Sequence, residues 1–100
     1  MEKTSYFLYL LPEATPGEEK YFDRKLCFRA MNYSTQDDKV FLQISEDRYD
    51  EKKLAINQTY ILEIETENDS SFSYYYLKGF EVENMESVFN LTLYVNQLKV

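Results

Sequence analysis

Apolar and polar residues alternate with a period of two along much of this chain, which is the pattern of strands that bury one face. Residues 39–45 show it most clearly, because valine, leucine and isoleucine alternate there with phenylalanine and glutamine. Residues 5–11 are apolar on both faces, which predicts a central or covered strand. Comparable runs between polar clusters predict six strands in all, over residues 5–11, 20–33, 39–45, 59–67, 72–83 and 87–100.

The segments between these runs carry residues that favour turns and loops. Two prolines and a glycine predict a loop over residues 12–19, and a polar cluster predicts a turn over residues 32–38. The only helical signal lies over residues 46–57, where acidic residues precede lysines as the helix macrodipole favours. Because this segment is short, we expect at most one short helix near residues 46–56. Gly79 predicts a bulge or a sharp bend inside the fifth run.

The alternation also assigns side chains to a core face and an outer face. Over residues 59–67 it predicts that the core face holds Tyr60, Leu62 and Ile64. In the fifth run the predicted core residues have even numbers: Phe72, Tyr74, Tyr76, Phe80 and Val82. In the second run the predicted core residues are Phe22, Leu26, Phe28 and Ala30.

These elements predict one all-β domain over residues 1–100. The order of three strands, a short helix and two strands resembles that of the OB-fold, a five-stranded and partly open barrel. A long second strand and a bent fifth strand suit a barrel, because its strands must curl. The sixth strand is one more than the OB-fold needs, and it fits a β-sandwich equally well. An OB-like partly open barrel and a β-sandwich are therefore both consistent with the pattern.

Composition and charge reduce the number of function classes that fit this chain. The chain has 18 acidic and 11 basic residues, a net charge of −7, whereas proteins that coat nucleic acids or anionic membranes are usually basic. No run approaches the roughly 20 apolar residues of a membrane-spanning helix, so no membrane partner is expected. No signal peptide is evident at the amino terminus. One cysteine permits no intrachain disulfide, which favours a reducing compartment, and we expect the cytoplasm.

The residues that are missing argue against catalysis. There is no histidine, which removes the usual general base and the commonest metal ligand. One cysteine cannot form an all-cysteine zinc site, and two glycines cannot form a phosphate-binding glycine-rich loop. We therefore expect no enzymatic activity, no cofactor and no metal. The mid-strand Cys27 is expected to be a buried structural thiol, since no base lies near it in the sequence.

One candidate surface is the outer face of the second strand together with the third. Residues 20–33 carry four cations and one acid, and aromatic residues between cations can stack on bases while the cations pair with phosphates. The ordinary alternative is that these side chains pack and pair across neighbouring strands. The candidate residues for single-stranded nucleic acid are Tyr21, Lys25, Arg29, Tyr33 and Phe41.

Two further candidate surfaces would bind protein. Glu63, Glu65 and Glu67 alternate along the fourth strand about 7 Å apart, a spacing close enough to that of phosphates to engage a basic protein groove. The alternative is a solvated edge strand that carries charge against aggregation. The run around Tyr74, Tyr75 and Tyr76 has more aromatic residues than one face can bury, so some of them could anchor an interface.

The leading hypothesis is a non-catalytic protein-binding module, a small acidic inhibitor or accessory factor of viral or mobile-element origin. Its partner would be a protein, with a basic nucleic-acid-binding enzyme as the example that the acidic face suggests. The first alternative is an OB-like domain that binds single-stranded nucleic acid. The second is a structural subunit of an assembly, which leaves a homo-oligomer open because sheet edges can pair with other chains.

Overall fold

The computed structural model of this chain describes residues 3–11 and 25–98. Strands dominate it, and the only helical elements in the described residues are two short 3-10 turns. The elements are β1 (Ser5–Leu11), β2 (Lys25–Ala30), β3 (Asn32–Gln36), β4 (Lys39–Ser45), η2 (Glu46–Arg48), η3 (Glu51–Lys53), β5 (Thr59–Glu65), β6 (Ser70–Met85) and β7 (Val88–Leu98). The predicted all-β class is confirmed. Within the described residues, no helix is long and apolar enough to cross a membrane.

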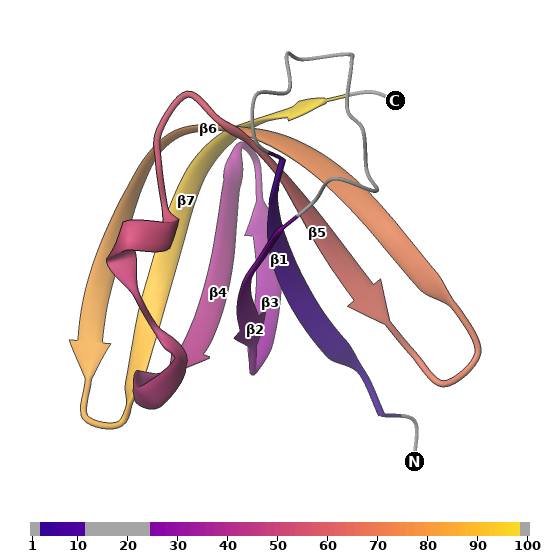
Figure 1. The fold of residues 1–100 in the computed structure, drawn as a ribbon, viewed down its shortest axis with the longest axis horizontal. Helices are drawn as coiled ribbons and strands as arrows, with labels where there is room; N and C mark the ends of the chain where they lie inside the picture. Colours follow the sequence, from indigo (N-terminus) through magenta and orange to yellow (C-terminus); the bar gives the residue numbers. More distant parts are fainter. Residues whose placement is uncertain (1–2, 12–24, 99–100) are drawn as a thin grey trace.

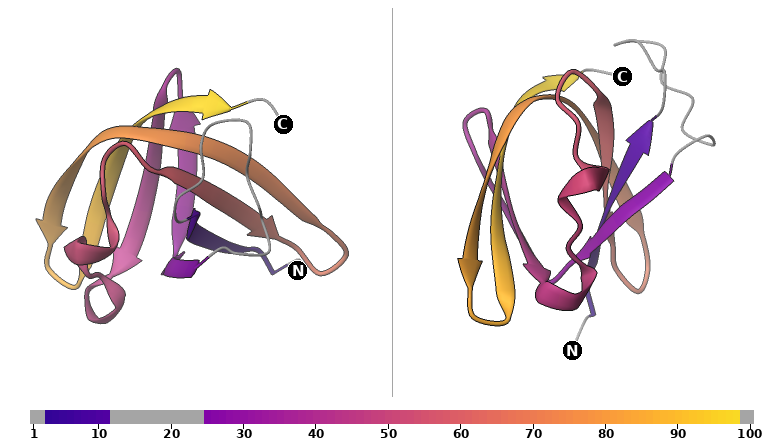
Figure 2. Two further views of the ribbon diagram at one scale, coloured as in Figure 1. Left: turned by 45° about the horizontal axis from the view of Figure 1, so that its top comes forward. Right: turned by 60° about the vertical axis from the view of Figure 1, so that its left-hand side comes forward.

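All seven strands form one antiparallel sheet in the order β2-β1-β5-β6-β7-β4-β3 (Figure 1). The sheet curls over, and η2 and η3 lie across the opening between its two halves (Figure 2). The edge strands β2 and β3 are consecutive in the chain and meet at Met31, whose N–H donates to the carbonyl of Gln43 at 2.7 Å. The chain thus passes directly from β2 at one edge of the sheet to β3 at the other edge, with a bend at Met31. The result is an open barrel rather than a closed one.

The interior of this barrel is filled by alternate side chains from every strand except β3, whose Tyr33 packs against it from the side. Tyr49, between η2 and η3, covers one opening, and its ring stacks on Phe28 and on Phe89 with centroids 5.6 and 4.6 Å apart. The buried core consists of Leu8, Cys27, Phe28, Ala30, Val40, Leu42, Ile44, Leu54, Tyr60, Leu62, Tyr75, Leu77, Leu91, Leu93 and Val95.

The predicted boundaries of two strands are confirmed, and one predicted turn is wrong. β1 and β4 have the expected residues, whereas β3 occupies most of the segment predicted to turn at residues 32–38. The turn itself is reduced to two residues, and Asp37 there has a φ of 56°. Asn32, Ser34 and Gln36 are polar and exposed because β3 is an edge strand, so its sequence looks like a loop. The predicted loop at residues 12–19 lies outside the described residues.

The expected short helix is two separate 3-10 turns. The side chain of Asp50 accepts a hydrogen bond from the N–H of Lys52 at 3.0 Å, which caps η3. Tyr49 lies between the turns in extended conformation, so that its ring reaches the core. The helical signal in the sequence therefore reflects two short turns, of which η3 has a side-chain cap, and not a continuous helix.

Two bulges change which side chains face the core. The pairing of β6 with β7 shifts between Leu77 and Gly79, as the glycine predicted, so alternation starts afresh there. Phe80 packs against the core as expected, but Tyr75 is buried in it, contrary to the prediction for the residues before the bulge. The second shift pairs Tyr9 with Leu26 and leaves Cys27 as the extra residue. Leu26 is consequently 54% exposed, where the alternation predicted a core position.

These assignments predict a clear difference between two leucines. Replacing Leu62, which is fully buried, with alanine should lower the free energy of unfolding by about 2–5 kcal/mol, because it leaves a cavity in the barrel. The matched control Leu26→Ala removes the same atoms from an exposed position and should cost no more than about 0.5 kcal/mol. Urea denaturation followed by circular dichroism measures both. Equal losses would contradict the bulge in β2.

Candidate functional site

Acidic residues concentrate in one part of the chain. Residues 63–86 contain seven acids and a single cation, Lys78. The structure divides these acids among three places. Glu63 lies within β5, a second group lies at the β5–β6 hairpin, and a third group lies along the second half of β6 and in the loop that follows. The hairpin group is Glu65, Glu67 and Asp69, and the third group is Glu81, Glu83 and Glu86.

Glu63 is not part of an exposed acidic face, and this corrects the sequence-based expectation. It is only 7% exposed, and it accepts a hydrogen bond from the hydroxyl of Tyr9 at 2.9 Å. On the sheet it lies between Phe7 of β1 and Phe72 of β6, whose rings restrict access to it. Glu65 and Glu67 are exposed, but Glu67 lies beyond the end of β5. The predicted row of three carboxylates is therefore reduced to a short acidic hairpin.

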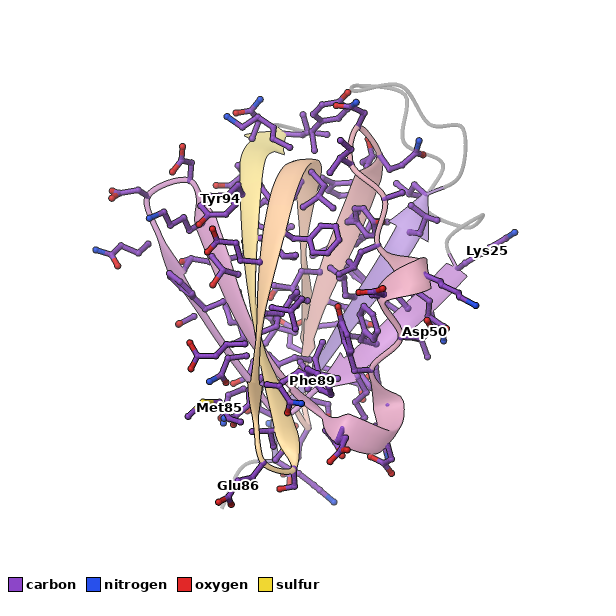
Figure 3. The ribbon with its side chains drawn as sticks, turned by 90° about the vertical axis from the view of Figure 1, so that its left-hand side faces the viewer. Lys25, Asp50, Met85, Glu86, Phe89 and Tyr94 are labelled. Atoms are coloured by element: carbon purple, nitrogen blue, oxygen red, sulfur yellow. The ribbon has the colours of Figure 1, made fainter. Side chains whose placement is uncertain are left out.

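The third acidic group lies on the outer face of β6 with Met85, while Val82 projects from the opposite face. Glu81 and Glu83 are exposed on the outer side of β6, while Val82 is 37% and Met85 is 47% exposed. Figure 3 shows Met85 and Glu86 at the tip of the β6–β7 hairpin. We call this region, Lys78 to Glu86, the acidic arm. Its acids have no cation within ion-pair distance among the described residues.

Tyr94 borders the acidic arm. A hydrogen bond to the carboxylate of Glu81 raises the pKa of the Tyr94 hydroxyl, because ionised tyrosine would face that negative charge. The ammonium of Lys39 lies 5.7 Å from the centroid of the same ring. Figure 3 places Tyr94 farther along β7 from the hairpin tip. The carboxylate of Glu81 therefore accepts a hydrogen bond from the hydroxyl of Tyr94.

The acidic arm also has an open strand edge, which sequence reasoning missed. β5 pairs with β6 only over Ser70–Tyr76, and the last backbone bonds on that side join Leu77 to Asn57 and Gln58. At Asn57 the backbone has a φ of 65° and turns away. From Lys78 onward, no strand in the described part of the chain pairs with this side of β6 (Figure 1). The unequal lengths of the fourth and fifth predicted strands were the signal that could have revealed it.

The three consecutive tyrosines of β6 do not share one surface. Tyr75 is buried in the core, where loss of solvation raises its pKa to about 12. Tyr74 and Tyr76 are half-buried on the outer face, beside Ile61 and Thr59 of β5. The hydroxyl of Tyr76 donates to the side-chain oxygen of Asn57 at 3.4 Å. Tyr75 is therefore removed from the predicted binding residues.

The structure brings together only some of the residues predicted to bind nucleic acid. Lys25 and Arg29 are exposed on β2, and the Arg29 guanidinium lies 5.8 Å from the ring centroid of Phe7. Tyr33 packs against the core, with its ring 5.7 Å from that of Tyr6. Phe41 lies on the outer side of β4, and it lines the same surface hollow as Tyr33. Tyr21 lies outside the described residues. Of the other four, the structure places Tyr33 beside the same hollow as Phe41, and Lys25 on the same strand as Arg29.

Nucleophile and metal chemistry find little support in the described residues. Cys27 is buried, and loss of solvation raises its pKa to about 11, although a backbone hydrogen bond and the charge of Lys53 oppose this. Its thiol contacts the backbone carbonyls of Lys25 and Lys53 at 3.7 Å. Within the described residues, no group of three or more potential ligands is placed to hold a metal ion.

Comparison with protein-family models, curated proteins and solved structures finds no match for this chain.

The buried ionisable groups predict that alkaline pH destabilises the fold. Below pH 9 the thiol of Cys27 is protonated in both states, whereas between pH 9 and 11 the unfolded chain loses this proton and the folded chain keeps it. The free energy of unfolding should therefore fall across this range, and burial of Tyr60 and Tyr75 extends the fall toward pH 12. Urea titrations at several pH values should show a shallower fall for Cys27→Ala. An identical fall in that variant would contradict the burial of the thiol.

Proposed function

We propose that this chain is a non-catalytic protein-binding module whose partner is a basic protein, and that the partner binds the acidic arm. The observation that supports it most is the combination of exposed Glu81 and Glu83 with two exposed apolar side chains, Met85 on the same face of β6 and Val82 on the opposite face. Protein interfaces commonly place apolar contacts at the centre and charge at the rim. Complementary charge then selects the partner and speeds its association.

We also propose that none of the chain's own residues has a catalytic role. There is no histidine, and the one thiol has a pKa of about 11, so it remains protonated at neutral pH. The remaining candidates are carboxylates, lysines and tyrosines. On the acidic arm Lys78, Glu83 and Glu86 are exposed, and Glu81 is hydrogen-bonded to Tyr94. We therefore propose that no cofactor is needed, and that the buried thiol fits a reducing compartment such as the cytoplasm.

A nucleic-acid-binding enzyme is the kind of basic partner that we favour. Glu81 and Glu83 alternate on one face of a strand and are thus separated by about 7 Å, similar to successive phosphates of a nucleic-acid strand. A carboxylate row of this kind can occupy a groove that is lined by lysine and arginine. The chain would then act as an inhibitor or accessory factor, in keeping with a viral or mobile-element origin.

Binding of single-stranded nucleic acid is less well supported. Its described candidate residues come from three strands, β2, β3 and β4, and Tyr33 packs against the core. A phosphate backbone that followed the outer face of β6 would meet Glu81 and Glu83. Assembly with copies of the same chain is opposed by the net charge of −7. Both alternatives become outcomes of the experiment below.

Neutralising the acidic arm should weaken partner binding. The test variant is Glu81→Gln, Glu83→Gln and Glu86→Gln, and the matched control is Glu65→Gln, Glu67→Gln and Asp69→Asn on the other hairpin. All six positions are exposed. Each substitution should therefore change the free energy of unfolding by no more than about 0.5 kcal/mol relative to the parent. Immobilised chains are incubated with extract of the source cells, with and without nuclease treatment, and captured proteins are identified by mass spectrometry.

A basic protein should be captured by the parent and by the control, but at least tenfold less by the test variant, and its capture should weaken with salt. Equal capture by all three chains would contradict the proposal. So would capture that disappears on nuclease treatment, which would indicate nucleic acid, or retention of this chain alone, which would indicate self-assembly.

A further inference from the structure

The pairing of β6 with β7 determines which backbone groups reach the open edge. Residues Glu86 and Ser87 form a two-residue loop closed by the pair Met85 and Val88, and in such hairpins this closing pair exchanges both backbone hydrogen bonds. Along an antiparallel strand, successive residues point their N–H and C=O groups to opposite sides. The residues that direct these groups to the open edge are therefore Phe80, Val82 and Asn84.

This edge is accessible from the barrel side as well as from outside. The side chains of Val82 and Asn84 share a face with Phe80, which packs against the core. If the segment that carries η2 and η3 covered the edge, these two side chains would be buried. Instead, Val82 is 37% exposed and Asn84 is exposed. Space therefore remains beside the edge on both faces of β6.

The position of β5 shows where an added strand would lie. β5 occupies this side of β6 as far as Leu77, where Asn57 turns the chain away. Beyond that point the line of β5 continues past Gly79 to Met85 without a strand from the described residues. At about 3.3 Å per residue, this stretch accommodates an extended segment of roughly six or seven residues.

We propose that the basic partner binds by adding such a segment to the open edge of the acidic arm as an eighth strand, a mode known as β-augmentation. This inference rests on the proposed function and names the chemistry of the partner. Side chains of neighbouring strands that share a face interact directly. The segment therefore carries lysine or arginine on the outer face beside Glu81 and Glu83, and apolar residues on the inner face beside Phe80 and Val82.

A second copy of this chain does not fit this description. Pairing two acidic arms edge to edge would bring Glu81 and Glu83 beside the same residues of the other copy, and like charges on neighbouring strands are destabilising. The carboxylates therefore disfavour pairing of two copies at this edge. The same charges favour a strand that carries basic residues.

The test uses a fluorescent seven-residue peptide, blocked at both ends, that alternates lysine and valine. The matched probe has the same sequence but carries N-methyl groups on the residues whose N–H would face β6, so its charge is unchanged while those donors are removed. Anisotropy titration should show binding of the first peptide and at least tenfold weaker binding of the second. Amide hydrogen exchange of the parent chain should slow at least tenfold at Val82 and Asn84 when the first peptide is bound.

Two variants complete the experiment. Val82→Pro removes an N–H that faces the open edge and none that bonds to β7, so the chain should fold and lose the peptide. The charge variant Glu81→Gln with Glu83→Gln should weaken the binding of both peptides. The control variant Glu65→Gln with Glu67→Gln should weaken the binding of neither. Equal binding of the two peptides, or slowed exchange outside residues 78–85, would overturn strand addition. If charge substitutions weakened binding while N-methylation did not, the proposed function would stand and only this inference would fail.

Discussion

The structure depends on the unequal length of β6 and its neighbours. β6 has 16 residues, and it pairs with β5 only through its first half while β7 follows it to the hairpin. Its first half is therefore central in the sheet and its second half is an edge. The central half is accordingly aromatic on both faces, and the edge half carries glutamates on its outer face. The change from one to the other occurs at the bulge between Leu77 and Gly79.

The bulge allows both halves to contribute to one core. Tyr75 and Leu77 point inward before it, and Phe80 points inward after it, which uninterrupted alternation cannot provide. Gly79 is compatible with this bend but is not required by space, because a Cβ atom there would meet only Tyr94 Cδ2 at 3.8 Å. The position of the bulge is thus determined by the need for core side chains both before and after it, and not by the glycine itself.

The fold class and most of the core could be predicted because period-two alternation is a local property. Val40, Leu42 and Ile44 are buried as that alternation requires. Gly79 indicated where the bulge in β6 lies, but the pattern could not show which residues before it face the core, since aromatic residues on both faces of β6 satisfy either phase equally well. The bulge in β2 could not be located from the pattern. The burial of Glu63 depends on Phe7, which is 56 positions away along the chain but adjacent in the sheet. The open edge was missed for the same reason, because strand order is not encoded in any single run.

Tyr60 contributes both to the core of this small barrel and to the position of a neighbouring loop. Tyr60 fills the core with its ring, and its hydroxyl accepts a hydrogen bond from the N–H of Ala55 at 2.8 Å and donates one to the carbonyl of Lys53 at 3.2 Å. One side chain thereby provides apolar volume and also ties down the segment after η3. That segment leads to Asn57, where the chain leaves β6. The core contact of Tyr60 therefore helps to hold the chain away from the edge, and the open edge of the acidic arm is a consequence of how the core is packed.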